Sequence, residues 1–395
     1  MAKQFDVVVI GGGLVGASCA LSIAKINPSI NIAVVEASQV TDEYHPSFDD
    51  RSIALAQQSV EYLQTLNLFD QNAPYTSAIK KVSVSDRGHF GKTHIQSTEF
   101  AKPSLGYVVE VNPFGRALHQ RLVQSSISIF CPDSVIEIKQ TLHSNALTLQ
   151  SGEQLNAKLI IVADGAQSPT RQLLGLNFNT QPYEQGAIIA NIEVAEGHNN
   201  HAFERFTQHG PMALLPMSNN RYSLVWCMEK EQINSYMDLN EIEFLSALQS
   251  AFGYRAGQFV KVGMRASSPL VYGQAESLIA HRTVVIGNAA HAIHPIAGQG
   301  FNLGLRDVQV LSDLIANSPN ELGSYAFTRE YGQLRSQDIK TVMTLTDALV
   351  RLFSNSSRVL ALGRSIGLFS MDLFPALKAP LAKQLMGQVK QGSRL

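Results

Sequence analysis

The feature that most restricts the fold of this chain is a glycine cluster directly behind an apolar run near the N-terminus. Residues 5–16 read FDVVVIGGGLVG. A β-branched run of this kind indicates a strand buried in a parallel sheet, and the spacing GxGxxG indicates a tight turn from that strand into a helix. Gly11 allows the turn, Gly13 lets the backbone approach a pyrophosphate, and Gly16 lets the helix pack closely on the strand.

The residues that follow complete the pattern of a dinucleotide-binding unit. Residues 17–26 are typical of a helix, and residues 31–35 of a second strand that ends in Glu36. A helix N-terminus near Leu14 favours a phosphate because its N–H groups are free and its dipole is positive there. The carboxylate of Glu36 lies 20 residues after Gly16, where it can accept hydrogen bonds from ribose hydroxyls. The cofactor contacts expected here are Gly11, Gly13, Leu14, Gly16 and Glu36.

Two later apolar runs end in similar polar turns. Residues 159–165 read LIIVADG, and residues 283–307 read TVVIGNAAHAIHPIAGQGFNLGLRD, with a helix expected from about Asn302. The carboxyl ends of parallel strands line one crevice, so a ligand that reaches all three turns must be as long as FAD. The amides at the start of the last helix would face the flavin pyrimidine ring, where negative charge gathers on reduction. The cofactor contacts expected in these turns are Asp164, Gly287, Asn288, Gly298, Gln299, Gly300 and Asn302.

Charge and cysteine content exclude several other classes of protein. Lys and Arg number 31 against 32 for Asp and Glu, so no overall field favours nucleic acid. The three cysteines lie far apart without CxxC or zinc spacing, so we expect no disulfide framework, no dithiol redox site and no metal. The apolar run of residues 5–10 is too short for a signal peptide, and no run reaches the length of a membrane-spanning helix.

The last part of the chain is both basic and apolar. Residues 348–395 contain seven Lys or Arg and one Asp, together with apolar groups such as residues 359–362 and 366–369. We expect amphipathic helices over residues 346–395. Such helices suit a membrane surface or an acidic partner, and they equally suit a helical pair packed on the body with solvated lysines. The two interpretations are compatible.

The motifs in this order resemble the group A flavoprotein aromatic hydroxylases, which have the para-hydroxybenzoate hydroxylase fold. The similarity extends over nearly the whole chain and is greatest to the hydroxylases of ubiquinone biosynthesis. The segments that carry it are HPSFDDRSIALA (45–56), VSDRGHFG (84–91), PYEQGAIIANIE (182–193), AFERFTQHGPMALLPM (202–217), SLVWC (223–227) and HPIAGQGFNLGLRD (294–307). One departure is Asn288, because the family has Asp there; Asn can still bond the ribityl hydroxyls, but without charge.

The resemblance implies an α/β fold with three parts. A Rossmann-type FAD-binding domain would comprise residues 1–76, 100–180 and 268–345, an inserted β-sheet domain for the substrate residues 77–99 and 181–267, and a helical tail residues 346–395. It also implies hydroxylation of 2-polyprenyl-6-methoxyphenol in ubiquinone synthesis through a flavin C4a-hydroperoxide, with O₂ and transient NAD(P)H. Such an enzyme would be cytoplasmic and peripheral to the inner membrane, with other quinone-biosynthesis proteins as partners.

The resemblance also suggests particular side chains around the flavin and the substrate. Arg51 and Arg116 match family arginines that pair with phosphate or ribityl oxygens. An apolar substrate face is expected at Pro211, Met212 and Leu215, because water would destroy the reactive flavin species. The catalytic candidates are His294, the backbone of Pro295, and His209, since histidine titrates near neutral pH. Trp226 is more simply explained as core packing.

Alternatives to this function stay open. The first is a hydroxylase of the same family that acts at another ring position or on a soluble aromatic. The second is a non-catalytic subunit that holds flavin in a quinone-biosynthesis assembly, which Asn288 favours. The third is a flavin-dependent dehydrogenase or reductase of prenyl chains, which would not need O₂.

Overall fold

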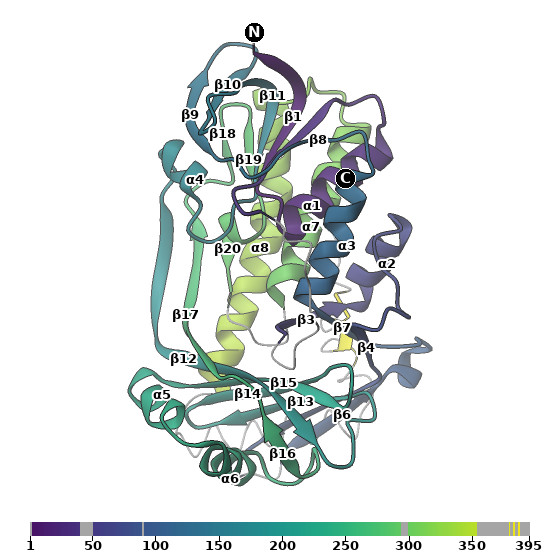
Figure 1. Cartoon of the computed structure of the whole chain (residues 1–395), viewed down its shortest axis with the longest axis vertical. Helices are drawn as coiled ribbons and strands as arrows, with labels where there is room; N and C mark the ends of the chain where they lie inside the picture. The colour runs from purple at the N-terminus through teal and green to yellow at the C-terminus, as the bar shows by residue number, and fades with distance from the viewer. Residues whose placement is uncertain are drawn as a thin grey trace.

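A computed structural model describes residues 2–39, 50–88, 91–293 and 299–353, together with residues 379, 382–383 and 386–387. The chain forms two units stacked along the long axis of the molecule (Figure 1). We call them the parallel-sheet unit, at the top of that view, and the mixed-sheet unit, at the bottom. A small third sheet lies between them.

The parallel-sheet unit is built on strands in the order β18-β19-β11-β1-β2-β8. Pairing is parallel from β19 through β8, so the three apolar runs predicted as strands do lie side by side, with β11 between β1 and β19. A β9–β10 hairpin extends the sheet from β11. The bounds are β1 (Lys3–Ile10), β2 (Ile32–Val35), β8 (Ser128–Phe130), β9 (Val135–Gln140), β10 (Asn145–Leu149), β11 (Gln154–Val162), β18 (Ile279–Ala280) and β19 (Thr283–Val285).

Helices cover this sheet because its central strands are apolar on both faces. Residues 7–9 of β1 and residues 159–162 of β11 are all inaccessible to solvent. The bounds of the helices are α1 (Leu14–Ile26), α2 (Gln57–Thr65), α3 (Val111–Val123), α4 (Pro169–Leu173), α7 (Gln299–Asn317) and α8 (Tyr325–Phe353). The helix expected from about Asn302 thus starts earlier.

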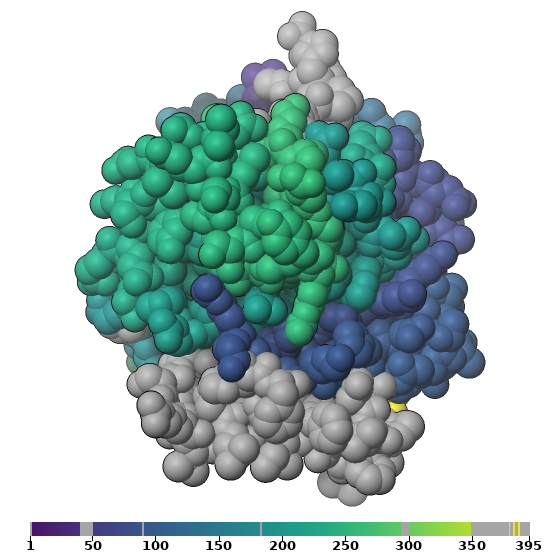
Figure 2. All heavy atoms as spheres, turned by 90° about the horizontal axis from the view of Figure 1, so that it is seen from below, coloured from purple at the N-terminus to yellow at the C-terminus, as the bar shows by residue number. Residues whose placement is uncertain are grey.

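The mixed-sheet unit follows the strand order β20-β17-β12-β15-β14-β13-β5-β6, with β16 paired to β12. Helices α5 and α6 pack on its lower face, where Trp226 lies in a cluster with Phe244 and Leu248, so the packing interpretation of this tryptophan is confirmed. Figure 2 shows the underside as a broad teal and green surface. The bounds are β5 (Lys81–Asp86), β6 (Lys92–Gln96), β12 (Phe178–Val194), β13 (His201–Thr207), β14 (Gly210–Pro216), β15 (Arg221–Glu229), β16 (Phe259–Val262), β17 (Ala266–Ala275), β20 (His291–Ala292), α5 (Lys230–Met237) and α6 (Glu241–Phe252).

The two units share long elements. Strands β12 and β17 run from the upper unit into the lower sheet (Figure 1), so the domain limits expected near residues 180 and 268 fall inside continuous strands. The limit expected at residue 346 likewise falls inside α8. The three-stranded sheet β3-β7-β4 was not predicted; its bounds are β3 (Ser52–Ala56), β4 (Thr76–Ile79) and β7 (Gly106–Glu110).

Part of the expected tail packs on the body. Ala382 and Met386 are buried in a cluster with Ala54 of β3 and Val108 of β7. The Met386 carbonyl accepts a hydrogen bond of 3.0 Å from the Gln58 amide. The packing interpretation of the tail is therefore confirmed for these residues. The apolar and basic stretch of residues 354–378 lies outside the described residues.

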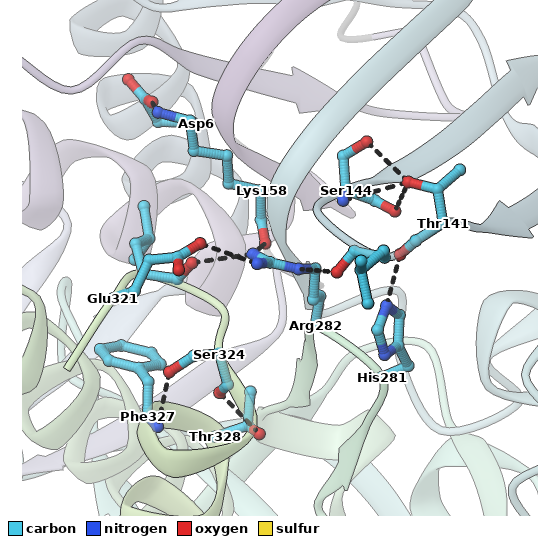
Figure 3. Close-up of polar contacts among 12 residues, drawn as sticks. Asp6, Thr141, Ser144, Lys158, His281, Arg282, Glu321, Ser324, Phe327 and Thr328 are labelled. Carbon is cyan, nitrogen blue, oxygen red and sulfur yellow. Dashed lines mark hydrogen bonds and ion pairs between the residues drawn. The ribbon is translucent and has the colours of Figure 1, made fainter.

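Arg282 ties the outer end of the parallel-sheet unit together (Figure 3). Its Nη1 donates to the carbonyl of Lys158 at 3.1 Å and to that of Leu322 at 3.0 Å, and its Nη2 lies 2.8 Å from the exposed carboxylate of Glu321. These bonds connect β11 with the loop between α7 and α8. They fix the end of the unit that lies away from the glycine turns.

Candidate active site

The three motif glycines perform different tasks in the turn after β1. Gly11 has φ +101°, and a Cβ there would lie 2.5 Å from the carbonyl oxygen of Ala163. A Cβ on Gly16 would lie 1.9 Å from the carbonyl oxygen of Gly11, so only glycine allows this helix–strand contact. By contrast, a Cβ on Gly13 would meet no atom of the described residues within 4 Å. The turn thus leaves open space beside Gly13, at the start of α1.

Glu36 lies across this turn at the end of β2. Its Oε2 accepts a hydrogen bond of 2.5 Å from the Gly12 amide, and its Oε1 one of 2.8 Å from the Ser38 amide. Helix α1 begins at Leu14 without a side-chain cap and without an acid in its first turn. A helix terminus of this kind favours an anionic ligand, and the neighbouring carboxylate accepts hydroxyl donors.

The third glycine turn packs directly against α1. Gly287 has φ +59°, and a Cβ there would lie 3.1 Å from the side chain of Val15; a Cβ on Gly304 of α7 would lie 2.9 Å from it. Asn288 is exposed beside this contact, and a Cβ on Gly300 would again meet open space. The turns after β1 and β19 and the start of α7 therefore converge on the N-terminus of α1.

A buried ion cluster holds the turn after β19 in place. Asp307 of α7 is inaccessible to solvent and accepts hydrogen bonds from the Gly287 amide at 2.8 Å, from His291 Nε2 at 2.8 Å and from Arg335 Nε at 2.7 Å. Burial by itself would raise the pKa of Asp307, but the neighbouring His291 and Arg335 lower it below its ordinary value. Arg335 also contacts Asp338 at 2.6 Å. Sequence reasoning missed this cluster.

The two expected arginines lie at the start of α3 and within it, and this helix packs against α1. The carbonyl of Arg51 accepts a hydrogen bond of 2.7 Å from Val111, the first residue of α3. Arg116 is half-buried on the same helix, directly after Gly115, where a Cβ would lie 3.5 Å from Leu14. Both remain predicted flavin contacts.

Two expected cofactor residues have side chains that are already bonded within the protein. Asp164 accepts hydrogen bonds from the Ser168 hydroxyl and from the Thr170 amide, so it fixes the start of α4. Asn302 bonds the backbone of β3 on both sides, accepting from the Ala56 amide and donating to the Ala54 carbonyl, each at 2.8 Å. Both remain predicted cofactor contacts, with these side-chain atoms also bonded within the protein.

The expected substrate residues divide between the two faces of the mixed sheet. Met212 is fully buried on the lower face with Trp226, which corrects its place in the substrate pocket. Alternation along β14 puts Pro211 and Leu215 on the upper face, where Leu215 packs on the cluster of β3 and β7. His209 lies in the turn before β14, with Nδ1 3.7 Å from Glu229. Its catalytic role remains a prediction.

Several predicted residues lie outside the described part of the chain. They are His294, Pro295 and Gly298, and the side chain of Gln299.

One carboxyl group on the upper face was not singled out from the sequence. Glu204 of β13 has an Oε1 that is sealed from solvent and has no hydrogen-bond partner in the described part of the chain. Burial raises its pKa from 4.5 to about 8. The signal was present in residues 202–206, AFERF, where this acid shares a strand face with Ala202 and Phe206.

The fold and this site together define a dinucleotide-dependent flavoprotein. The open space beside Gly13 and Gly300, the uncapped start of α1 and the carboxylate of Glu36 fit the pyrophosphate, flavin and ribose of FAD.

Comparison with known proteins gives the particular family. A model described as "FAD binding domain" matches residues 4–346. A ubiquinone hydroxylase (UbiL) from Rhodospirillum rubrum is 32% identical over 99% of this chain and 91% of its own length, and the 3-demethoxyubiquinol 3-hydroxylase of Escherichia coli is 28% identical over 97% and 98%. The crystal structure of p-nitrophenol 4-monooxygenase PnpA from Pseudomonas putida superposes with TM-score 0.80 at 18% identity, over all of both chains. The chain belongs to the FAD binding domain family of flavoprotein monooxygenases, among the hydroxylases of ubiquinone biosynthesis.

Proposed function

We propose that this protein hydroxylates the ring of a polyprenylated phenol, 2-polyprenyl-6-methoxyphenol, with FAD as cofactor, NAD(P)H as electron donor and O₂ as oxidant. FAD binds to the parallel-sheet unit, and the ring lies against the upper face of the mixed sheet. When bound, FAD would use two electrons from NAD(P)H to activate O₂, so that one oxygen atom enters the ring as a hydroxyl group and the other leaves as water. The residues of this chain orient the ring and exclude water from it.

The observation that carries this proposal is an apolar patch on the upper face of the mixed sheet. Ile189, Val225 and Leu215 are only partly covered there, whereas the opposite face of the same strands is packed under α5 and α6. Register places Val225 beside Ile189 of β12 and Ala213 of β14. A partly open apolar surface in mid-sheet suits an aromatic ring with an apolar chain, and it keeps water away from the reacting atoms.

The test is the lipid extract of an aerobically grown strain that lacks this gene. We expect 2-polyprenyl-6-methoxyphenol to accumulate, and to disappear when the gene is returned. Accumulation of a different intermediate that lacks one hydroxyl would move the reaction to another ring position. Unchanged quinone without any intermediate would contradict the proposal.

A purified assay separates this function from a non-catalytic role. The flavin-loaded protein should oxidise NAD(P)H faster when the phenol is added, and the hydroxylated product should appear only with O₂. Asn288 is the residue that favours the alternative of a subunit that only holds flavin. If the substrate stimulates neither NAD(P)H oxidation nor product formation, that alternative gains support. Product formation without O₂ would favour a dehydrogenase or reductase.

We further propose that the protein binds the inner membrane peripherally from the cytoplasm through its basic tail. In the described residues, no helix is both long and apolar enough to cross a bilayer. The tail segment 348–395 carries six net positive charges, which favour an anionic lipid surface. Because Met386 packs on the body, deletion of the tail would also damage the fold. The cleaner test replaces Arg358, Arg364 and Lys378 by Gln and measures flotation with anionic vesicles; undiminished flotation would contradict the proposal.

A further inference from the structure

The carboxyl group of Glu204 lies in a row of apolar side chains on the upper face of the mixed sheet. Register pairs Glu204 of β13 with Ala213 of β14 and with Val84 of β5, and Ala213 in turn with Val225. Directly paired residues point to the same face of a sheet. The carboxyl group is therefore the polar member of the row that forms the proposed ring-binding surface.

The upper face is the one that meets the parallel-sheet unit. Ala202, two residues before Glu204 on the same strand, packs with Leu215 against Ala54 of β3 and Val108 of β7. Alternation then puts Glu204 on the same side, one step further along β13. Helices α5 and α6 lie on the opposite side and do not cover it.

The hydrogen bonding of the Glu204 carboxyl group is incomplete in a way that a bound ligand would complete. Oε1 is excluded from solvent and has no hydrogen-bond partner among the described residues, although a buried polar atom without a partner is costly. Native proteins leave few such atoms, and those they leave often serve a site. A phenol oxygen placed on the patch would complete its bonding.

The charged and titratable groups around Glu204 do not explain its state. Desolvation by burial is the cause of its raised pKa, and within the described ranges no neighbouring charge contributes to the shift. The thiol of Cys227 on β15 is near enough for Glu204 to raise its pKa, but that thiol is itself buried. Asp86 lies on the same face of β5, two residues beyond Val84, whereas Arg205 alternates to the opposite face.

We propose that Glu204, in its protonated form, donates a hydrogen bond to the ring oxygen of the bound phenol and so positions the ring for hydroxylation. This assignment rests on the proposed function. Negative charge gathers on the ring oxygen as the phenol ionises, and a donor fixed in an apolar site stabilises that charge without reorganisation. A pKa near 8 keeps Glu204 protonated at neutral pH.

The test measures binding of 2-methoxyphenol to the flavin-loaded protein by calorimetry between about pH 6 and 9, where a phenol with an ordinary pKa of about 10 stays mostly protonated. Wild-type affinity should fall as pH rises through about 8, because the carboxylate no longer donates. Glu204→Leu should bind about tenfold more weakly at pH 7, without that pH dependence. Glu204→Gln keeps an amide donor, so it should bind within about threefold of wild type, also without the dependence. Glu231→Gln, on exposed α5, is the matched control and should behave as wild type.

Flavin content and melting temperature should first establish that each variant is folded. The assignment is overturned if Glu204→Leu binds as wild type does, or if Glu204→Gln keeps the change near pH 8. It is also overturned if wild-type affinity rises through pH 8, since the carboxylate would then act as a base. Failure of the proposed function gives a different result: the probe binds with the expected ranking, but neither it nor the prenylated phenol is hydroxylated. No binding to the wild type would overturn both.

Discussion

Replacement of Asp307 by Asn should destabilise this protein by about 3 kcal/mol or more. The carboxylate is fully buried and accepts three hydrogen bonds, from Gly287, His291 and Arg335. Asparagine preserves the shape but removes the charge, and its NH₂ group faces donors. Loss of one partner from a buried ion pair costs ~3–5 kcal/mol, a large part of the ~5–15 kcal/mol by which typical chains are stable.

The assay is urea unfolding of the flavin-loaded protein, followed by circular dichroism. Glu321→Gln is the control, because its carboxylate also pairs with a buried arginine, Arg282, but is itself 66% exposed, so its loss should change stability little. The contribution of Asp307 should also disappear in acid. Its folded pKa is below the ordinary value of 3.8, so its stabilisation is present above 3.8 and is lost as pH falls through the folded pKa. A loss below ~1 kcal/mol in Asp307→Asn at pH 7 would refute this reasoning.

Three further predictions concern the glycine turn, Glu204 and the thiols. Gly16→Ala should give little folded protein, because its Cβ would lie 1.9 Å from a carbonyl oxygen. Gly13→Ala should fold normally but bind FAD more weakly, because its Cβ enters the open space. Equal FAD binding by the two variants would contradict the assignment of that space to FAD. Wild-type stability should fall as pH rises from 4.5 to about 8 and then level off, since folded Glu204 keeps a proton over this range that the unfolded chain has released. Thermal melts of Glu204→Gln should lack this component. Of the three cysteines, only Cys131 is not buried. Mass spectrometry after brief thiol labelling of the native protein should therefore find one adduct. Two adducts would show that the fold opens readily around a buried thiol.

The central fold was predictable from the sequence because its signals are local. Each of β1, β11 and β19 is an apolar run that ends in a glycine or a polar turn, and the parallel pairing follows from burial on both faces. The small sheet of β3, β4 and β7 was not predicted, because its strands have only four or five residues and pair across long stretches of sequence. The sequence of such a short strand does not show which other strand it pairs with.

The candidate site was only partly predictable for the same physical reason. Glycines that avoid backbone clashes can be recognised by spacing, but the partner of a polar side chain depends on tertiary packing. Asn302 could serve a ligand or the backbone, and only the position of β3 decides in favour of the backbone. Arg335 meets Asp307 because α7 and α8 lie side by side. The face of the sheet on which Met212 lies depends on the register of β14, and that register puts Met212 on the lower face.

The strand order of the upper sheet has a consequence for how the protein is made. Strand β1 is synthesised first, yet it lies in the interior of the sheet, and its neighbour β11 pairs Leu155 with Lys3. The first half of the opposite edge of β11 pairs with β10, but residues 160–162 at its apolar end stay unpaired there until β19 is made, after every strand of the lower sheet except β20. A nascent chain therefore carries an unpaired apolar strand edge from the synthesis of β11 until that of β19. Such an edge is prone to pair with other chains, so yield in the cell should depend on chaperones and on slow synthesis at low temperature.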